Sequence, residues 1–103
     1  MRSARIFFHG EFAGVLEEIE YGKRYSFRYS DGYSGAAISH TMPVEKREYR
    51  FDRFPPFFDG LLPEGVMLEG LLRQEKIDRN DLFGQLLAVG QELVGAVTVE
   101  EVL

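Results

Sequence analysis

The sequence has no cysteine and only two histidines among its 103 residues. Without cysteine, the chain cannot form a disulfide framework, a thiolate zinc site, an iron–sulfur site or a cysteine nucleophile. His9 and His40 lie far apart and form no closely spaced pair of the kind that binds zinc. His9 falls in an expected turn and is interpreted as a solvated residue, and His40 near Pro43 as a structural or surface residue. We therefore expect no metal site and no cofactor.

The chain also lacks the short motifs of nucleotide-dependent enzymes. Its glycines are scattered, and it contains neither a phosphate-binding loop nor a dinucleotide fingerprint. A protein-kinase catalytic loop and an Asp-Phe-Gly motif are absent as well. Asp59 and Glu64 could form a carboxylate pair, but Pro63 separates them, and capping of the following helix is the commoner role for such residues. The sequence predicts no catalytic residues and no enzyme activity of its own.

No long apolar run occurs either. The N-terminal run Ile6–Phe8 is too short for a signal peptide, and no run approaches the ~20 residues that cross a bilayer. A cytoplasmic location is expected. The net charge is −5 and the arginines are spread singly, so we expect no membrane partner and no nucleic-acid binding beyond peripheral contact.

Aromatic and aliphatic residues, in contrast, are plentiful. The sequence is 45% hydrophobic and contains nine phenylalanines and five tyrosines. A chain of this length is expected to form one domain, residues 1–103, which buries about 60–70% of the surface that its unfolded form exposes. Composition and length together predict a folded domain with its own core.

The first half of the chain has the pattern of short strands. The expected strands cover residues 4–8, 12–19, 24–30, 36–42 and 47–51. Alternation is clearest in the third, where Tyr25, Phe27 and Tyr29 fall on one face of a sheet. Gly10 suits the first turn because it can take a positive φ.

Acidic residues crowd the end of the second expected strand. Glu17, Glu18 and Glu20 are interpreted as a solvated face where this strand reaches water. The pair Glu100 and Glu101 near the C-terminus has the same interpretation.

From Asp52 onward the pattern becomes helical. A short helix or 3₁₀ turn over 57–62 should end at Pro63, and helices are expected over 64–76 and 77–90. A strand over 95–99 should return to the sheet. The sequence thus predicts an α+β fold, an antiparallel β-meander or small barrel-like sheet of about five to six strands packed with two to three helices.

Apolar side chains define the expected inward faces of the helices. They are Phe57, Phe58, Leu61 and Leu62 in the first, Met67, Leu68, Leu71 and Leu72 in the second, and Leu82, Phe83, Leu86 and Leu87 in the third. Asp78 or Asn80 could cap the third helix, and Gly90 suits its end. Val66 lies almost opposite the stripe of its own helix, on the polar face.

Three stretches carry a family resemblance. They are FFDGLLPEG at 57–65, DLFGQLLAVGQELVGAVTV at 81–99 and, less specifically, ISHTMPV at 38–44. In order and spacing they resemble the N-terminal domain of the HipA-type serine/threonine kinases, and the match covers nearly the whole chain. One departure is Gly60, where the family usually carries asparagine.

The resemblance implies a function and partners. HipA kinases are much longer and carry their ATP site and catalytic aspartate in later domains, whereas this chain stops just after its GAVTV strand. It is therefore expected to be the N-terminal domain as a separate protein, as in the HipS subunits of HipBST toxin–antitoxin systems. The resemblance then implies an antitoxin that neutralises a shortened kinase toxin, HipT, alongside HipB, a helix-turn-helix DNA-binding protein. The alternative is a structural or regulatory subunit that completes the kinase fold without inhibiting it.

A partner contact is expected at the start of the second helix, at Pro63, Glu64, Gly65, Val66 and Met67. Val66 is apolar but lies off the core stripe, just after a proline break that directs the helix start outward. Exposed apolar side chains of this kind often serve interfaces. The competing interpretation is that single exposed apolar residues are common and have no function.

Overall fold

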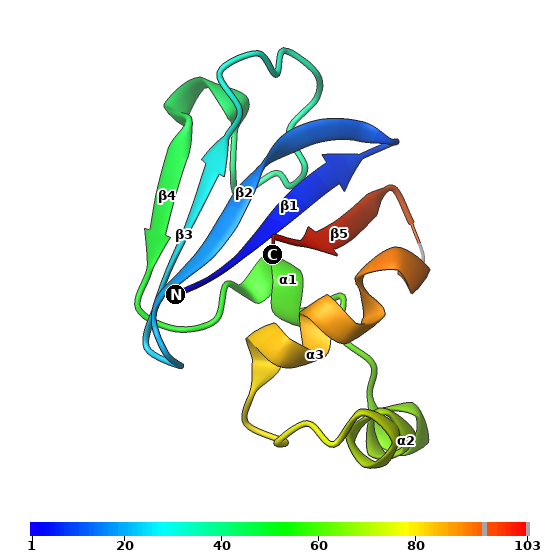
Figure 1. The fold of residues 1–103 in the computed structure, drawn as a ribbon. Helices are drawn as coiled ribbons and strands as arrows, with labels where there is room; N and C mark the ends of the chain where they lie inside the picture. Colours follow the sequence, from blue (N-terminus) through cyan, green and yellow to red (C-terminus); the bar gives the residue numbers. More distant parts are fainter. Residues whose placement is uncertain (94, 103) are drawn as a thin grey trace.

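The computed structural model describes residues 1–93 and 95–102, which form one five-stranded antiparallel sheet with helices on one face (Figure 1). The strands are β1 (Arg2–Phe8), β2 (Glu11–Glu20), β3 (Arg24–Tyr29), β4 (Glu48–Phe51) and β5 (Val97–Glu101). Their order across the sheet is β4-β3-β2-β1-β5, so β4 and β5 are edge strands and the sheet is open. The predicted α+β fold is confirmed as an open sheet, not a closed barrel.

The described residues also form three α-helices and two 3₁₀ turns. They are α1 (Pro56–Asp59), α2 (Gly65–Glu75), α3 (Leu82–Val89), η1 (Val44–Lys46) and η2 (Gly90–Glu92). In Figure 1, α1 and α3 lie directly under the sheet, whereas α2 lies further out. Pro56 opens α1, where its missing N–H costs nothing.

Glycine decides the geometry at two places in the sheet. Gly10 takes a φ of 81° in the β1–β2 turn, as predicted, and the preceding His9 also has a positive φ, of 51°. A Cβ at Gly14 would collide with the carbonyl oxygen of Arg28 on the next strand. Glycine at this position therefore lets β2 and β3 pair closely.

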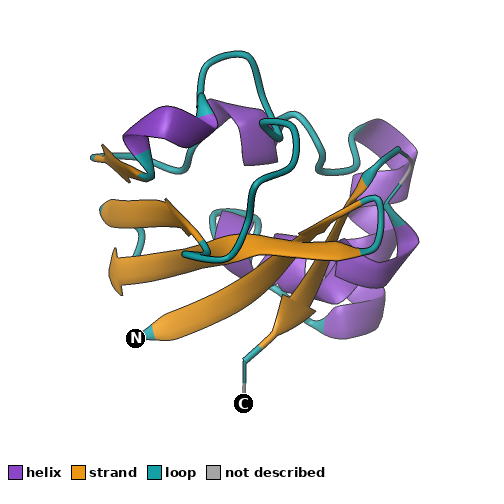
Figure 2. Cartoon of the chain, turned by 90° about the horizontal axis from the view of Figure 1, so that it is seen from above, coloured by secondary structure: helices purple, strands orange, loops and turns teal. Residues whose placement is uncertain are grey.

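The end of the chain returns to its beginning. β5 pairs antiparallel with β1, and the Val102 N–H donates to the Ser3 carbonyl at 3.0 Å. Figure 2, seen from above, shows the strands splayed by the twist of the sheet and both termini on the same side of the molecule. The last strand, expected at 95–99, is thus confirmed with a slight shift to Val97–Glu101.

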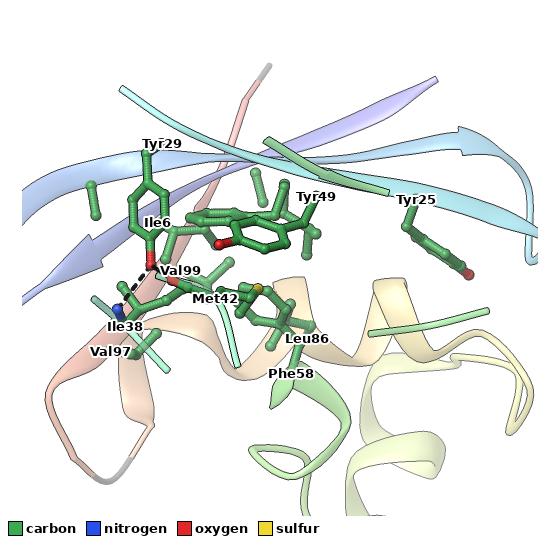
Figure 3. Close-up of a cluster of buried hydrophobic side chains, with 14 of the residues drawn as sticks. Ile6, Tyr25, Tyr29, Ile38, Met42, Tyr49, Phe58, Leu86, Val97 and Val99 are labelled. Carbon is green, nitrogen blue, oxygen red and sulfur yellow. Dashed lines mark hydrogen bonds between the residues drawn. The ribbon is translucent and has the colours of Figure 1, made fainter. Parts of the chain in front are cut away.

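The core lies between the sheet and its helical layer. Tyr25, Phe27 and Tyr29 all point inward and are buried, as their alternation predicted. Figure 3 shows tyrosines of the sheet facing Phe58 of α1 and Leu86 of α3. The predicted role of the 57–62 segment, which was to tie helices to sheet, is confirmed because Phe58 is fully buried and its apolar neighbours pack on the core.

The prediction of a strand at 36–42 is wrong. This segment is an irregular loop, and it is fixed by the hydroxyl of Tyr29 instead of by strand pairing. The Ile38 N–H donates to that hydroxyl at 3.1 Å, and the hydroxyl donates to the Met42 carbonyl at 2.5 Å (Figure 3). The loop nevertheless contributes Ile38 and Met42 to the core, which is why its sequence is partly apolar.

The third helix starts later than predicted, at Leu82 instead of Ile77. Its cap is Asp81, whose side chain accepts from the Gly84 N–H at 3.0 Å, not Asp78 or Asn80. Asp78 organises the preceding turn, since its side chain accepts from the Asn80 N–H at 2.8 Å. The predicted end of the helix at Gly90 is confirmed.

Candidate partner-binding surface

The helix α2 is an outlying element that packs mainly against α3 (Figure 1). None of its residues is buried, and Leu68, Leu71 and Leu72 are only half-buried. Met67 was predicted to share this inward stripe, which is wrong because its side chain is 75% exposed. Because α2 packs mainly against one neighbouring helix, the stripe that it buries is narrower than the stripe predicted from the sequence.

Two large apolar side chains therefore stand in solvent at the start of α2. Val66 is 87% exposed, as its position on the helical wheel predicted, and Met67 lies beside it. Among the other described large hydrophobic side chains, only Met1 at the chain terminus, at 85%, and Tyr21, at 67%, are exposed to a comparable degree, and neither has an apolar neighbour that is equally exposed. The structure thus brings together, at one helix end, the residues that the sequence singled out from Pro63 to Met67.

The backbone explains why this end projects. Glu64 has extended dihedral angles, with φ −130° and ψ 164°, and Gly65 has a φ of 59°. Glu64 occupies the N-cap position but makes no capping hydrogen bond with its side chain, and Asp59 is the last residue of α1. The predicted capping by a side-chain hydrogen bond is therefore wrong for both carboxylates, although Glu64 lies at the N-terminus of α2, where its negative charge can complement the helix dipole.

A hollow of about 420 Å³ lies beside Met67, between the start of α2 and the end of α3. Its apolar lining comes from Leu61, Met67, Val89 and Leu93, and its two charged residues are Glu64 and Glu92. Leu61, Val89, Glu92 and Leu93 were not among the predicted site residues. No local pattern could have marked them, because the hollow exists only when segments some 30 residues apart fold together.

An ion pair fixes α2 to the segment that follows it. The Arg79 guanidinium contacts Glu69 through two bonds, at 2.7 and 2.8 Å, although both side chains are exposed. The hydrogen bond from Arg79 lowers the pKa of Glu69. At the C-terminal end of α2, Lys76 adopts the left-handed conformation and its N–H donates to the Leu72 carbonyl.

Comparison with known proteins agrees with this architecture. A sequence model of the family described as the HipA N-terminal domain matches residues 4–100. The chain belongs to the HipA N-terminal domain family. A solved structure of the N-terminal domain of HipA toxin superposes with a TM-score of 0.79 at 30% identity, over 100% of this chain and 94% of that one. An uncharacterized protein of Haemophilus influenzae is 35% identical over 101 residues, which cover 98% of this chain and 93% of the relative.

Membership of this family connects the chain with Hip toxin–antitoxin systems. In this HipA N-terminal domain the stretch 57–65, which carried the resemblance, links the core to the projecting helix start. Phe58 is buried at one end of it, and Glu64 and Gly65 are exposed at the other.

A second cluster of polar residues in this domain is structural. Glu18, predicted to face solvent, is only 3% exposed, which corrects that interpretation. Arg2 donates to both oxygens of Glu18, at 2.8 and 3.0 Å, and to both oxygens of Asp81, at 3.1 and 2.7 Å. The Tyr25 hydroxyl donates to Glu18 as well, at 3.4 Å.

This network joins three strands to the start of α3, and its geometry shifts the ionisation of its members. Burial and the Glu18 carboxylate raise the pKa of Tyr25 to about 12. Burial opposes ionisation of Asp81, but the Arg2 guanidinium and the Gly84 N–H hold the pKa of Asp81 below its ordinary value. The alternation of side chains along β2 could have indicated the burial of Glu18. Leu16 faces inward, so Glu18, two residues later in the same strand, faces inward too.

The remaining candidates are metal-binding groups and the two histidines. No group of three His, Asp or Glu side chains in the described part of the chain could hold a metal ion. His40 lines an open hollow of the 34–47 loop with small side chains, and His9 packs its ring on Phe8. No helix among the described residues is long and apolar enough to cross a membrane.

Proposed function

We propose that this HipA N-terminal domain is an antitoxin that binds and neutralises a shortened, HipT-like serine/threonine kinase by direct protein contact near its active site. The complex would also contain a HipB-like DNA-binding protein. The observation that carries the proposal is the apolar pair Val66 and Met67, held in solvent on a helix end that the fold leaves uncovered. Burying two such side chains contributes about 1.5–3 kcal/mol each, enough to anchor an interface.

The size of a relative supports a separate binding protein. The Haemophilus influenzae relative matches this chain over 93% of its own length, which leaves no room in it for a kinase core. A domain of this family that occurs without the kinase can act on one only in trans. The proposed mechanism is that α2 docks where the fused domain meets the kinase core and obstructs or distorts phosphoryl transfer.

A mutational experiment tests the contact. In cells that express the HipA-like kinase, Val66→Asp and Met67→Asp should each abolish rescue of growth and weaken co-purification about tenfold or more, because a buried charge without a partner is costly. Gln74→Asp, at the exposed far end of the same helix, is the matched control and should still rescue growth. Circular dichroism and urea unfolding check that all variants fold.

Unchanged rescue by both aspartate variants, with normal folding, would remove this helix start from the mechanism. Both substitutions are at side chains that touch little of the protein, so loss of folding is not the expected cause of any defect.

A non-inhibitory subunit is the second candidate function. The observation in its favour is that the solved structure with the same fold is the N-terminal domain of a toxin, which supports a role as an integral part of a toxin assembly. Such a subunit would complete the kinase fold and bridge it to the DNA-binding partner. Kinase activity with and without the chain separates the two functions, since only an antitoxin lowers it.

A further inference from the structure

The hollow beside Met67 has a composition that defines what could enter it. Its walls are mostly apolar, from Leu61, Met67, Val89 and Leu93, while Glu64 and Glu92 supply carboxylates. No lysine or arginine of the described chain lines it. Carboxylates beside an apolar surface attract a cationic group of a partner and repel an acidic group.

We infer that this hollow is a specificity pocket that takes an apolar side chain of the kinase partner together with an adjacent lysine or arginine. The inference rests on the proposed function and specifies its site: Val66 and Met67 anchor the contact, and the hollow selects the partner by charge. The apolar side chain would contact Leu61 and Leu93, and the cation would pair with Glu64 and Glu92.

A second copy of this chain is a poorer occupant. The chain carries a net charge of −5, and in a symmetric contact between two copies Glu64 and Glu92 of one copy would face the same residues of the other. Two such surfaces would place carboxylates against carboxylates, which disfavours association. A basic segment on a different protein meets the same hollow with complementary charge.

The volume of the hollow is also suited to one or two side chains and not to a whole helix or strand. A hollow of about 420 Å³ that is open on one side is larger than one aromatic or long aliphatic side chain but smaller than a stretch of helix. The pocket is therefore expected to accept one or two side chains of an interface that is centred on the start of α2.

The test is the affinity for the HipA-like kinase at several salt concentrations. The double variant Glu64→Gln/Glu92→Gln should bind about 10–100-fold more weakly at low salt, since each charge pair at an interface contributes about tenfold. Wild-type binding should weaken as salt is raised from 50 to 500 mM, and the double variant should lose most of this dependence. Glu75→Gln, a carboxylate at the other end of α2, is the control and should match the wild type in both respects.

The outcomes separate this inference from the proposed function. Absence of any binding by the wild-type chain contradicts the proposed function itself. Binding that Met67→Asp abolishes, but that the double glutamine variant leaves unchanged in affinity and salt dependence, overturns the specificity pocket alone. A dimer of the chain by itself that Met67→Asp dissolves would assign the hollow to a second copy and overturn the choice of partner.

Discussion

A single glutamate shows how far burial can be inferred at the residue scale. Glu18 belongs to an acidic run that has the composition of a solvated strand end, yet it is one of the least exposed polar residues of the chain. Period two, counted from the buried Leu16, places Glu18 inside, and Arg2 reaches the same face by alternation with Ala4. In these strands the alternation of side chains therefore predicts burial better than composition does, because each side chain points to one of the two faces of the sheet.

Removing the Glu18 carboxylate should destabilise the fold markedly. Glu18→Ala leaves Arg2 with one partner and deprives Tyr25 of its acceptor, so the free energy of unfolding should fall by about 2–4 kcal/mol. Glu20→Ala, two residues on and exposed, should change it by less than about 0.5 kcal/mol. Urea unfolding of both variants measures the difference, and equal midpoints would contradict the structural role of the network.

At the scale of the elements, the prediction succeeded where a local sequence pattern determines the structure. It failed where contacts between distant residues determine the structure. The sheet strands and the three helices follow from alternation and helical spacing. The segment 36–42 has the same apolar content as a strand, but its backbone groups bond to Tyr29, which no local pattern reveals. Met67 was assigned to an inward stripe for a similar reason: its helix has one covering neighbour, and only the tertiary structure shows this.

The start of α3 should be sensitive to acid. Asp81 caps this helix and pairs with Arg2, and its pKa is lowered in the folded protein. Its contribution to stability is therefore complete above the ordinary carboxyl pKa and disappears as the pH falls through the lower folded value, that is, below about pH 4. At pH 7 the Asp81→Asn variant should be less stable than wild type by about 1–3 kcal/mol.

Thermal unfolding of the two proteins between pH 7 and pH 2.5 checks this prediction. The difference in stability should shrink below pH 4, because both side chains are then uncharged. A difference that stays constant down to pH 2.5 would show that the charge of Asp81 contributes nothing.

At the scale of the whole molecule, the domain is built as a rigid sheet-and-helix core with one helix displayed beside it. The network of Arg2, Glu18 and Asp81 fixes α3 to the sheet, and the Arg79–Glu69 pair fixes α2 to the segment before α3. The exposed apolar side chains at the start of α2 thus lie on an element that joins the core through its neighbour α3 and through this surface ion pair. The sequence predicted the exposed Val66 but not the hollow, since Val89 and Leu93 reach it only through the fold.

The most direct test of the account is the activity of the HipA-like kinase partner, measured with purified protein in the presence of saturating amounts of this chain. The account predicts that autophosphorylation and substrate phosphorylation fall close to background with the wild-type chain. They should stay near the uninhibited rate with Val66→Asp or Met67→Asp at the same concentration. A kinase that binds the wild-type chain yet keeps its full activity would contradict the antitoxin function and support a non-inhibitory subunit.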